Sequence, residues 1–406
     1  MRCSLLIRLC VINFMPLSVV LKIALVFVSL LYASIAVNAE TLDSEMRESI
    51  VKIDVTVSDM YRRTETKQIT LTIFRPPGEN KSPLLILNHG RAVQSKRHLQ
   101  GRQRMLNQAR WFVEQGFVVI VPTRIGYGDT YSEFDPEYVG QCNSVQLDAK
   151  ERAIYQQILT VHEFAKTQSF IDTSHWLVAG QSLGGFVSVT VGRKAPEGLI
   201  GAINFAGGYG GDPDTRRGNS CSPWAWERSL AKQTSERQVP ILWVYWKDDW
   251  YWGNETPVKW FKSFQTGGGT GEFVQSNPIT GDGHSGFYRD FNAWIPVVYK
   301  FLSSLPINSK LTLKEPFLVP QKTEFAKISE TEKVPYISEQ GKYAYRKFLN
   351  SDSSRAFAIN PDGRFGWSVG HWNSPERALR FCNQSAKKAC RLYAVDEAIV
   401  WNAEKN

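Results

Sequence analysis

The chain has 406 residues, of which 43% are hydrophobic, 12% aromatic and 21% charged, and its formal net charge is +9 at pH 7. This apolar content excludes a disordered chain, and the ordinary counts of 30 glycines and 19 prolines exclude a collagen-like one. No fixed-period repeat is present, which excludes a solenoid. At about 150 residues per domain, this length predicts two domains and additional segments.

The first 39 residues form a separate apolar segment. They include the apolar run at 23–33 and end in Val37-Asn38-Ala39, with small residues at both positions that a signal peptidase reads. We therefore expect a signal peptide over residues 1–39 and an exported protein, either periplasmic or secreted. The alternative is an uncleaved membrane anchor, because residues 11–37 are long enough to span a bilayer. Only in that case do we expect membrane attachment.

Without residues 1–39 the net charge is +6, because this segment holds three basic and no acidic residues. One local basic cluster follows, consisting of Arg91, Lys96, Arg97, His98, Arg102 and Arg104. The motifs and the basic stripes with interleaved aromatic residues that bind nucleic acid are absent, so no nucleic-acid partner is expected. We interpret the cluster as a solvated helix face rather than an anion site.

From residue 49 to about residue 304, apolar strand-like runs alternate with amphipathic helical stretches. The strand candidates are at 51–57, 69–74, 84–88, 118–121, 176–179, 201–205, 241–245 and 273–274. The helix candidates include 104–115, 147–165, 183–193 and 257–265. Most central runs are almost continuously apolar, as in parallel strands buried on both faces. This pattern predicts a doubly wound, mostly parallel α/β sheet in one domain over residues 40–304.

The remaining chain predicts a linker and a small α+β domain. Residues 305–340 are rich in Pro, Lys, Glu and Ser with isolated apolar residues, which indicates a linker or an extended wrap. Residues 341–406 predict a short helix, a strand at 356–359, a turn at 360–363, a helix at 375–383 and a strand at 392–395. A unit of about 60 residues is only marginally stable alone, and a disulfide would stabilise it.

Four cysteines follow the predicted signal: Cys142, Cys221, Cys382 and Cys390. An even number in an exported chain favours disulfides. Cys382 and Cys390 are close in the sequence and are expected to pair, which leaves Cys142 with Cys221. Domain proximity is the only basis for this choice among three connectivities, and reduced, buried cysteines are the alternative. The spacings do not match those of zinc sites.

A candidate nucleophile, Ser182, lies in Gly180-Gln181-Ser182-Leu183-Gly184, a G-x-S-x-G pattern. It follows the apolar run at 175–179 and precedes an apolar helical run at 186–191. A serine in a sharp strand-to-helix turn is a nucleophile elbow, and its flanking glycines let neighbouring backbone approach closely. The alternative is a glycine-rich turn that contains an ordinary serine.

A serine nucleophile needs a base and an acid that orients the base. Of the six histidines, only His284 and His371 follow Ser182, and His371 lies in the small C-terminal domain. We therefore predict His284, in a polar glycine-rich loop, as the base. Asp248 and Asp249 follow the strand between Ser182 and this loop, and Asp249 is preferred as the acid. The order serine, aspartate, histidine is one that such triads use.

The oxyanion donors are expected in two backbone positions. The strand at 84–88 ends in His89-Gly90-Arg91, where a first oxyanion loop should lie. The N–H groups of Leu183 and Arg91 are the candidates, and each such donor is worth about 3 kcal/mol in the transition state. His89 is interpreted as a structural loop residue rather than a second base.

The stretches LLILNHGR, GFVVIVPTRIGYGDT, HWLVAGQSLGG, ILWVYWKDDWYWGN and GDGHSGF resemble, in this order, the dienelactone-hydrolase-like esterases of the α/β-hydrolase superfamily. In that family the acid ends a Tyr-Gly-x-x-Asp stretch, which corresponds to Tyr245–Asp249 here. Trp246 replaces the glycine and is expected to crowd the acid loop. Dienelactone hydrolases proper use cysteine instead of serine, so their substrate is not implied. The C-terminal stretch 356–401, which begins AFAINPDGRFGWSVG and ends CRLYAVDEAIVW, resembles a small module attached to exported bacterial proteins.

The resemblance implies hydrolysis of carboxylic esters. We therefore predict an exported serine hydrolase that cleaves a small-molecule ester through an acyl-enzyme, without a metal or organic cofactor. The alternatives are a serine peptidase or amidase of the same fold, and a hydrolase-like binding protein without catalytic activity.

Overall fold

The computed structural model describes residues 40–233, 235–307, 311–384 and 386–403. The predicted signal peptide and the alternative membrane anchor lie outside these residues. The chain divides into a unit that ends at Asp43 and a unit that begins at Ser44, and every element below belongs to the second unit. Within the described ranges, no helix has the length and apolar character needed to span a bilayer.

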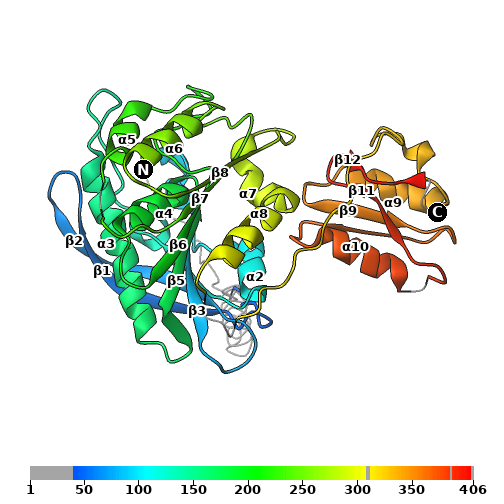
Figure 1. The fold of residues 1–406 in the computed structure, drawn as a ribbon, viewed down its shortest axis with the longest axis horizontal. Coiled ribbons are helices and arrows are strands. Elements are labelled where there is room, and N and C mark those ends of the chain that lie inside the picture. Colours follow the sequence, from blue (N-terminus) through cyan, green and yellow to red (C-terminus); the bar gives the residue numbers. More distant parts are fainter. Residues whose placement is uncertain (1–39, 234, 308–310, 385, 404–406) are drawn as a thin grey trace, which may run out of the picture. The chain divides into compact units, whose positions relative to one another are not determined.

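An eight-stranded sheet forms the larger part of the molecule (Figure 1). Its strand order is β1-β2-β4-β3-β5-β6-β7-β8. The pairs β1/β2 and β2/β4 are antiparallel, and the pairs from β4 through β8 are parallel. The strands are β1 (Ser49–Ser58), β2 (Thr64–Phe74), β3 (Ser82–Asn88), β4 (Val118–Thr123), β5 (Ile171–Gln181), β6 (Leu199–Phe205), β7 (Ile241–Trp246) and β8 (Gly271–Ser276). The predicted doubly wound, mostly parallel sheet is confirmed.

Helices cover both faces of this sheet (Figure 1). One face carries α3 (Leu147–Lys166), α4 (Leu183–Lys194), α5 (Pro223–Leu230) and α6 (Thr256–Thr266). The other carries α2 (Leu106–Glu114), α7 (Gly286–Arg289) and α8 (Phe291–Ser304). Short 3-10 helices are η1 (Gln94–Leu99), η2 (Gly128–Thr130) and η3 (Gly283–Ser285).

The sheet has a hydrophobic core on each face, because successive side chains of a strand point to opposite faces. In β3, Leu84 and Ile86 belong to the core under α3 and α4, whereas Leu85 and Leu87 belong to the core under α2 and α8. All four side chains are fully buried. Because successive side chains point to opposite faces, a continuous apolar run is what a strand between two helical layers requires.

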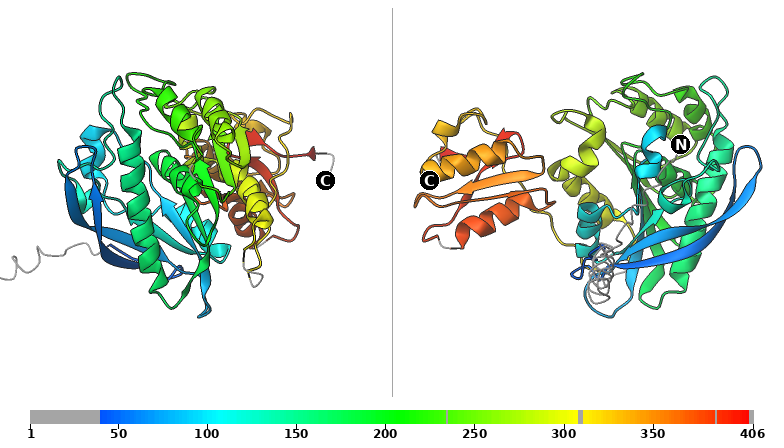
Figure 2. Two further views of the ribbon diagram at one scale, coloured as in Figure 1. Left: turned by 60° about the vertical axis from the view of Figure 1, so that its left-hand side comes forward. Right: turned by 180° about the vertical axis from the view of Figure 1, so that it is seen from behind.

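The C-terminal region has its own antiparallel four-stranded sheet, with order β10-β9-β11-β12. Figure 2 shows that helices cover both faces of it. Phe357 and Ile359 of β9 pack toward α9, and Ala356 and Ala358 pack toward α10. The strand β10 was not predicted. The elements are α9 (Glu339–Leu349), β9 (Arg355–Ile359), β10 (Phe365–Val369), α10 (Ser374–Asn383), β11 (Arg391–Val395) and β12 (Ala398–Ile399).

Between the two sheets, the segment predicted as a linker contains only one short 3-10 helix, η4 (Thr331–Lys333), among its described residues. It is nevertheless held to its surroundings. Lys314 N donates to Gln115 Oε1 at 2.8 Å, and Thr323 N donates to Ile399 O at 2.8 Å. These two hydrogen bonds connect the segment to the residue after α2 and to the C-terminal sheet.

Candidate active site

Ser182 lies in the sharp turn between β5 and α4, with φ 57° and ψ −122°. This backbone conformation is strained for a residue other than glycine. The Ser182 amide donates to Phe205 O at 2.9 Å. A Cβ on Gly180 would lie 2.4 Å from Gly184 O, and a Cβ on Gly184 would lie 2.0 Å from Asn88 O. Both glycines are thus required by close backbone contacts, and the turn has the form of a nucleophile elbow.

His284 and Asp249 are joined by a hydrogen bond of 3.0 Å between Nδ1 and Oδ2. Both side chains are buried. The other carboxylate oxygen of Asp249 accepts from Tyr251 N at 2.7 Å and from Trp252 N at 3.0 Å. These three hydrogen bonds fix the orientation of the carboxylate. Asp249 therefore fixes the proton of the imidazole on Nδ1 and leaves Nε2 free to accept one.

The histidine loop is fixed from several sides. Asp282 Oδ1 accepts from His284 N at 2.9 Å, and the Tyr251 ring stacks on the imidazole with centroids 4.0 Å apart. Gly283 N donates to Asp248 O at 3.0 Å. The Asp248 side chain is exposed. Of the two candidate acids, the structure therefore brings Asp249 to the histidine.

The elbow and the histidine loop meet directly. Gln181 Nε2, next to the serine, donates to His284 O at 3.0 Å. The Ser182 hydroxyl has no hydrogen-bond partner among the residues that the structure describes. Nucleophile–base hydrogen bonds are often long in free enzymes and tighten when substrate binds.

The predicted oxyanion loop also reaches the serine. A Cβ on Gly90 would lie 3.1 Å from Ser182 Cβ, so this glycine permits the close approach. The backbone amides of Leu183 and Arg91 make no hydrogen bond to any described residue. Two unpartnered N–H groups beside a buried serine are what an oxyanion hole requires.

His89 has a structural role in this loop. Its Nδ1 bonds to Gly90 O at 2.7 Å, and its Nε2 accepts from Arg124 N at 3.3 Å. Burial and the Arg124 charge lower the pKa of His89 to about 3, so the ring is neutral. A neutral ring bonded on both sides shapes the backbone before Arg91.

Trp246 does not crowd the acid loop, contrary to expectation. Its indole Nε1 donates to Asp290 Oδ2 at 2.8 Å, and a Cβ on Gly286 would lie 2.1 Å from the ring. The tryptophan therefore packs against the helices after the histidine loop, where Gly286 leaves space for it.

A sheet of this strand order carries Ser182 after β5, Asp249 after β7 and His284 after β8. The serine lies at the elbow, and the three residues occur in the order that triads of this architecture use. The chain has the α/β-hydrolase fold.

Several solved structures are similar to this chain. A protein assigned as a dienelactone hydrolase from Klebsiella pneumoniae has 14% identity and a TM-score of 0.40, over 60% of this chain and 91% of that one. An acetyl xylan esterase from a Paenibacillus species has 13% identity and a TM-score of 0.43, over 64% and 89%. An acylaminoacyl peptidase from Pyrococcus horikoshii has 13% identity and a TM-score of 0.42, over 66% of this chain and 43% of that one. No family model and no curated protein sequence matches the chain.

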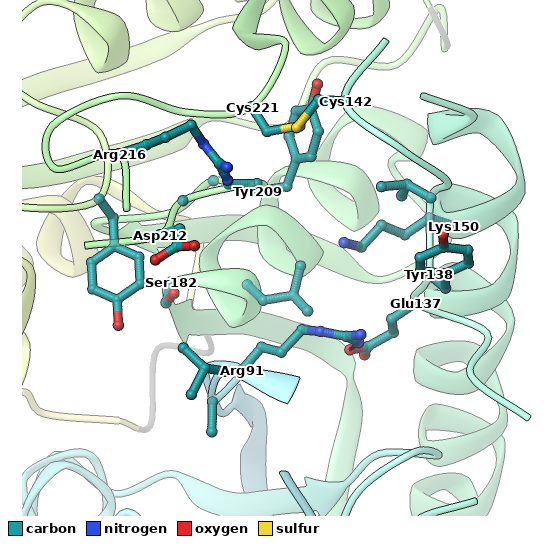
Figure 3. A pocket seen from close by; sticks show the side chains of 18 of the residues that line it. Arg91, Glu137, Tyr138, Cys142, Lys150, Ser182, Tyr209, Asp212, Arg216 and Cys221 are labelled. Carbon is teal, nitrogen blue, oxygen red and sulfur yellow. Dashed lines mark hydrogen bonds and ion pairs between the residues drawn. A yellow bond between two sulfur atoms is a disulfide. The ribbon is translucent and has the colours of Figure 1, made fainter. Parts of the chain in front are cut away.

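Ser182 opens into a cavity of about 520 Å³ (Figure 3). Its wall includes a disulfide between Cys142 and Cys221, and a second disulfide joins Cys382 to Cys390, in the expected pairing. Within the described part of the chain, no three His, Cys, Asp or Glu side chains are placed to hold a metal ion. The polar and aromatic side chains of the wall include Arg91, Arg97, Glu137, Tyr138, Lys150, Tyr209, Asp212, Arg216, Tyr251 and Trp252.

The interpretation of the basic cluster as a solvated helix face is wrong for four of its members: Arg91, Arg97, Arg102 and Arg104. Each is buried or half-buried and pairs with a carboxylate distant in the sequence. Arg91 and Arg97 both bond Asp135 Oδ2 at 2.6 Å. Arg102 and Arg104 pair with the fully buried Glu48 carboxylate.

Glu137 connects this network to the cavity. Its carboxylate accepts from Arg124 Nε at 2.6 Å, from Tyr127 OH at 2.5 Å and from Arg91 Nη1 at 3.2 Å. Burial by itself would raise the pKa of Glu137, but Arg124 and Arg91 lower it to about 2. The network holds Arg91, and with it the oxyanion loop.

Glu137 and Lys150 were not among the site residues predicted from the sequence. Nothing local marks Glu137, because its partners are distant in the chain. Lys150 could have been found, since it follows Leu147 by three residues and precedes Ile154 by four, and all three are buried on α3. A lysine on the apolar stripe of a helix needs a specific reason to be there.

Proposed function

We propose that this protein is an exported serine hydrolase that cleaves carboxylic esters, with residues 40–304 as its catalytic domain. The observation that carries the proposal is the buried Asp249–His284 pair beside a strained elbow serine that opens into a cavity. A serine needs this constellation only if it acts as a nucleophile.

In the first half-reaction, Ser182 Oγ attacks the ester carbonyl while His284 Nε2 accepts the hydroxyl proton. Asp249 stabilises the imidazolium, and the amides of Leu183 and Arg91 donate to the oxyanion. When the tetrahedral intermediate collapses, the C–O bond to the alcohol breaks and His284 protonates the leaving alcohol. The product is an acyl-enzyme on Ser182.

In the second half-reaction, His284 Nε2 accepts a proton from water, whose oxygen attacks the acyl carbonyl. The bond to Ser182 Oγ then breaks, His284 returns the proton to the serine, and the carboxylic acid leaves. Every proton passes through one imidazole, which explains why Asp249 holds its orientation so tightly.

Export is supported by the disulfide in the wall of the cavity. Disulfides persist in oxidising compartments and are rare in the cytosol. The Cys142–Cys221 bond joins segments 79 residues apart, so the wall of the site depends on an oxidised pair. Together with the predicted signal peptide, this supports a periplasmic or secreted enzyme.

Hydrolysis of 4-nitrophenyl acetate and 4-nitroacetanilide by the mature chain tests the proposal. We expect the ester to react and Ser182→Ala to lose at least about four orders of magnitude in kcat, as when other triad serines are removed. Ser303→Ala, which changes an exposed serine on α8, is the matched control and should keep the wild-type rate. Faster cleavage of the anilide would favour the peptidase or amidase, and undiminished activity in Ser182→Ala would overturn the mechanism.

A further inference from the structure

Lys150 lies on α3 and is only 4% exposed, yet it lines the cavity that contains Ser182. Figure 3 shows its ammonium group pointing into the cavity. The nitrogen lies 5.4 Å from the centroid of the Phe186 ring and 5.9 Å from that of Tyr209. The lysine therefore ends between two aromatic faces and the space where a substrate would bind.

This ammonium group has no hydrogen-bond or ion-pair partner among the described residues. The neighbouring carboxylates of Asp135 and Glu137 are both occupied by arginines. Around this part of the cavity there are thus two carboxylates, Asp135 and Glu137, for four buried or half-buried cations, which are Arg91, Arg97, Arg124 and Lys150. The other carboxylate in the cavity wall, Asp212, accepts from the backbone amides of Asp214 and Thr215. An unpaired buried ammonium is costly, and the missing anion has room only in the cavity.

We propose that Lys150 binds a carboxylate on the substrate, so that this enzyme selects esters that also carry a free carboxylate group. The inference rests on the proposed function and names its substrate class. A neutral substrate would leave the ammonium unpaired, whereas a carboxylate would supply a charge-assisted hydrogen bond. Arg91 is less suited to this role because Asp135 and Glu137 already occupy its guanidinium.

The electrostatics of the free site agree with this assignment. Burial, together with the positive charges of Arg91 and Arg124, lowers the pKa of Lys150 to about 7, although Glu137 and Asp135 oppose the shift. A bound carboxylate would raise this pKa and keep the lysine charged. Preference for the carboxylate should therefore decrease as the pH rises above about 7.

Two matched substrate pairs test the preference. The first places the carboxylate on the acyl side, as mono-4-nitrophenyl adipate against 4-nitrophenyl hexanoate. The second places it on the alcohol side, as 4-acetoxybenzoate against phenyl acetate. In at least one pair we expect the ratio of kcat/KM, anionic over neutral, to fall about tenfold or more in Lys150→Met, the usual scale of a hydrogen bond to a charged group.

Two further variants keep this test decisive. Lys150→Arg retains a cation and should restore part of the ratio even if Lys150→Met folds poorly. Lys166→Met, on the same helix, removes an exposed lysine that pairs with Glu163 and should leave the ratio unchanged. The inference is overturned if Lys150→Met and the wild type have the same anionic-over-neutral ratio of kcat/KM in both pairs. It is also overturned if the wild type shows no preference for the anionic substrate.

A binding experiment separates this inference from the proposed function. Calorimetry on Ser182→Ala compares monobenzyl glutarate with benzyl pentanoate, and then repeats both in Ser182→Ala/Lys150→Met. Tighter binding of the anionic ester that depends on Lys150 supports the carboxylate site, even if the wild type hydrolyses neither ester. If both esters bind equally well and the wild type hydrolyses them, the carboxylate site is rejected but the proposed hydrolase function is not.

Discussion

Two of the cations that line the cavity beside Ser182, Arg91 and Lys150, lie in opposite surroundings. Arg91 bonds Asp135 through both terminal nitrogens and reaches Glu137 as well, whereas Lys150 has no charged partner among the described residues. Lys150 is buried, and Arg91 is half-buried. The comparison shows two roles for a cation at a site. A paired cation holds the wall of the site in place, whereas an unpaired cation can bind an anionic ligand.

Substitution of Glu137 tests whether the ion pairs of Arg91 hold the wall of the site. Glu137→Gln leaves Arg91 and Arg124 without their shared carboxylate, so we expect the free energy of unfolding to fall by about 3–5 kcal/mol. Urea unfolding followed by circular dichroism measures this change. Glu133→Gln, at an exposed position in the same segment, is the control. Equal stability of the two variants would show that the network does not support the wall.

Substitution of the unpaired Lys150 should change stability in a way that depends on pH. The pKa of Lys150 is about 7 in the folded chain against 10.5 for a free lysine, so between these values the unfolded chain binds the extra proton. Wild-type stability therefore gains from this group as the pH rises. Lys150→Met lacks the effect. Its stability relative to the wild type should decrease by about 2 kcal/mol between pH 6.5 and 8.5.

Parallel urea unfolding of both proteins at the two pH values provides this measurement, with Lys166→Met as the control because its lysine is exposed. A difference between Lys150→Met and wild type that does not change with pH would mean that Lys150 keeps an ordinary proton affinity. The claim that Lys150 is a buried, unpaired cation would then be contradicted.

The features that could be predicted from the sequence are those that depend on residues close together in the chain or on chain order. Apolar runs such as the one in β3 predicted buried parallel strands, and the elbow around Ser182 was visible because its glycines are local. His284 and Asp249 followed from chain order, since few histidines could be candidates. The geometry of the structure brings these two side chains together as expected.

Features that depend on distant partners could not be predicted. Arg97 was interpreted as solvated because Asp135, which pairs with it, lies 38 residues away. The strand β10 was missed because it is only five residues long and the small residues Gly366 and Ser368 alternate with its larger apolar residues, and pairing with β9 stabilises it. Lys150 is an intermediate case, because the helical period could have shown that it is buried but not what its side chain faces.

The most direct test of the account is reaction of the folded mature chain with a fluorophosphonate probe, followed by mass spectrometry of the labelled peptides. The account predicts one adduct, on Ser182, present in the wild type and in Ser303→Ala and absent from Ser182→Ala. A folded protein that forms no adduct, or an adduct on another serine, would contradict the claim that Ser182 is an activated nucleophile.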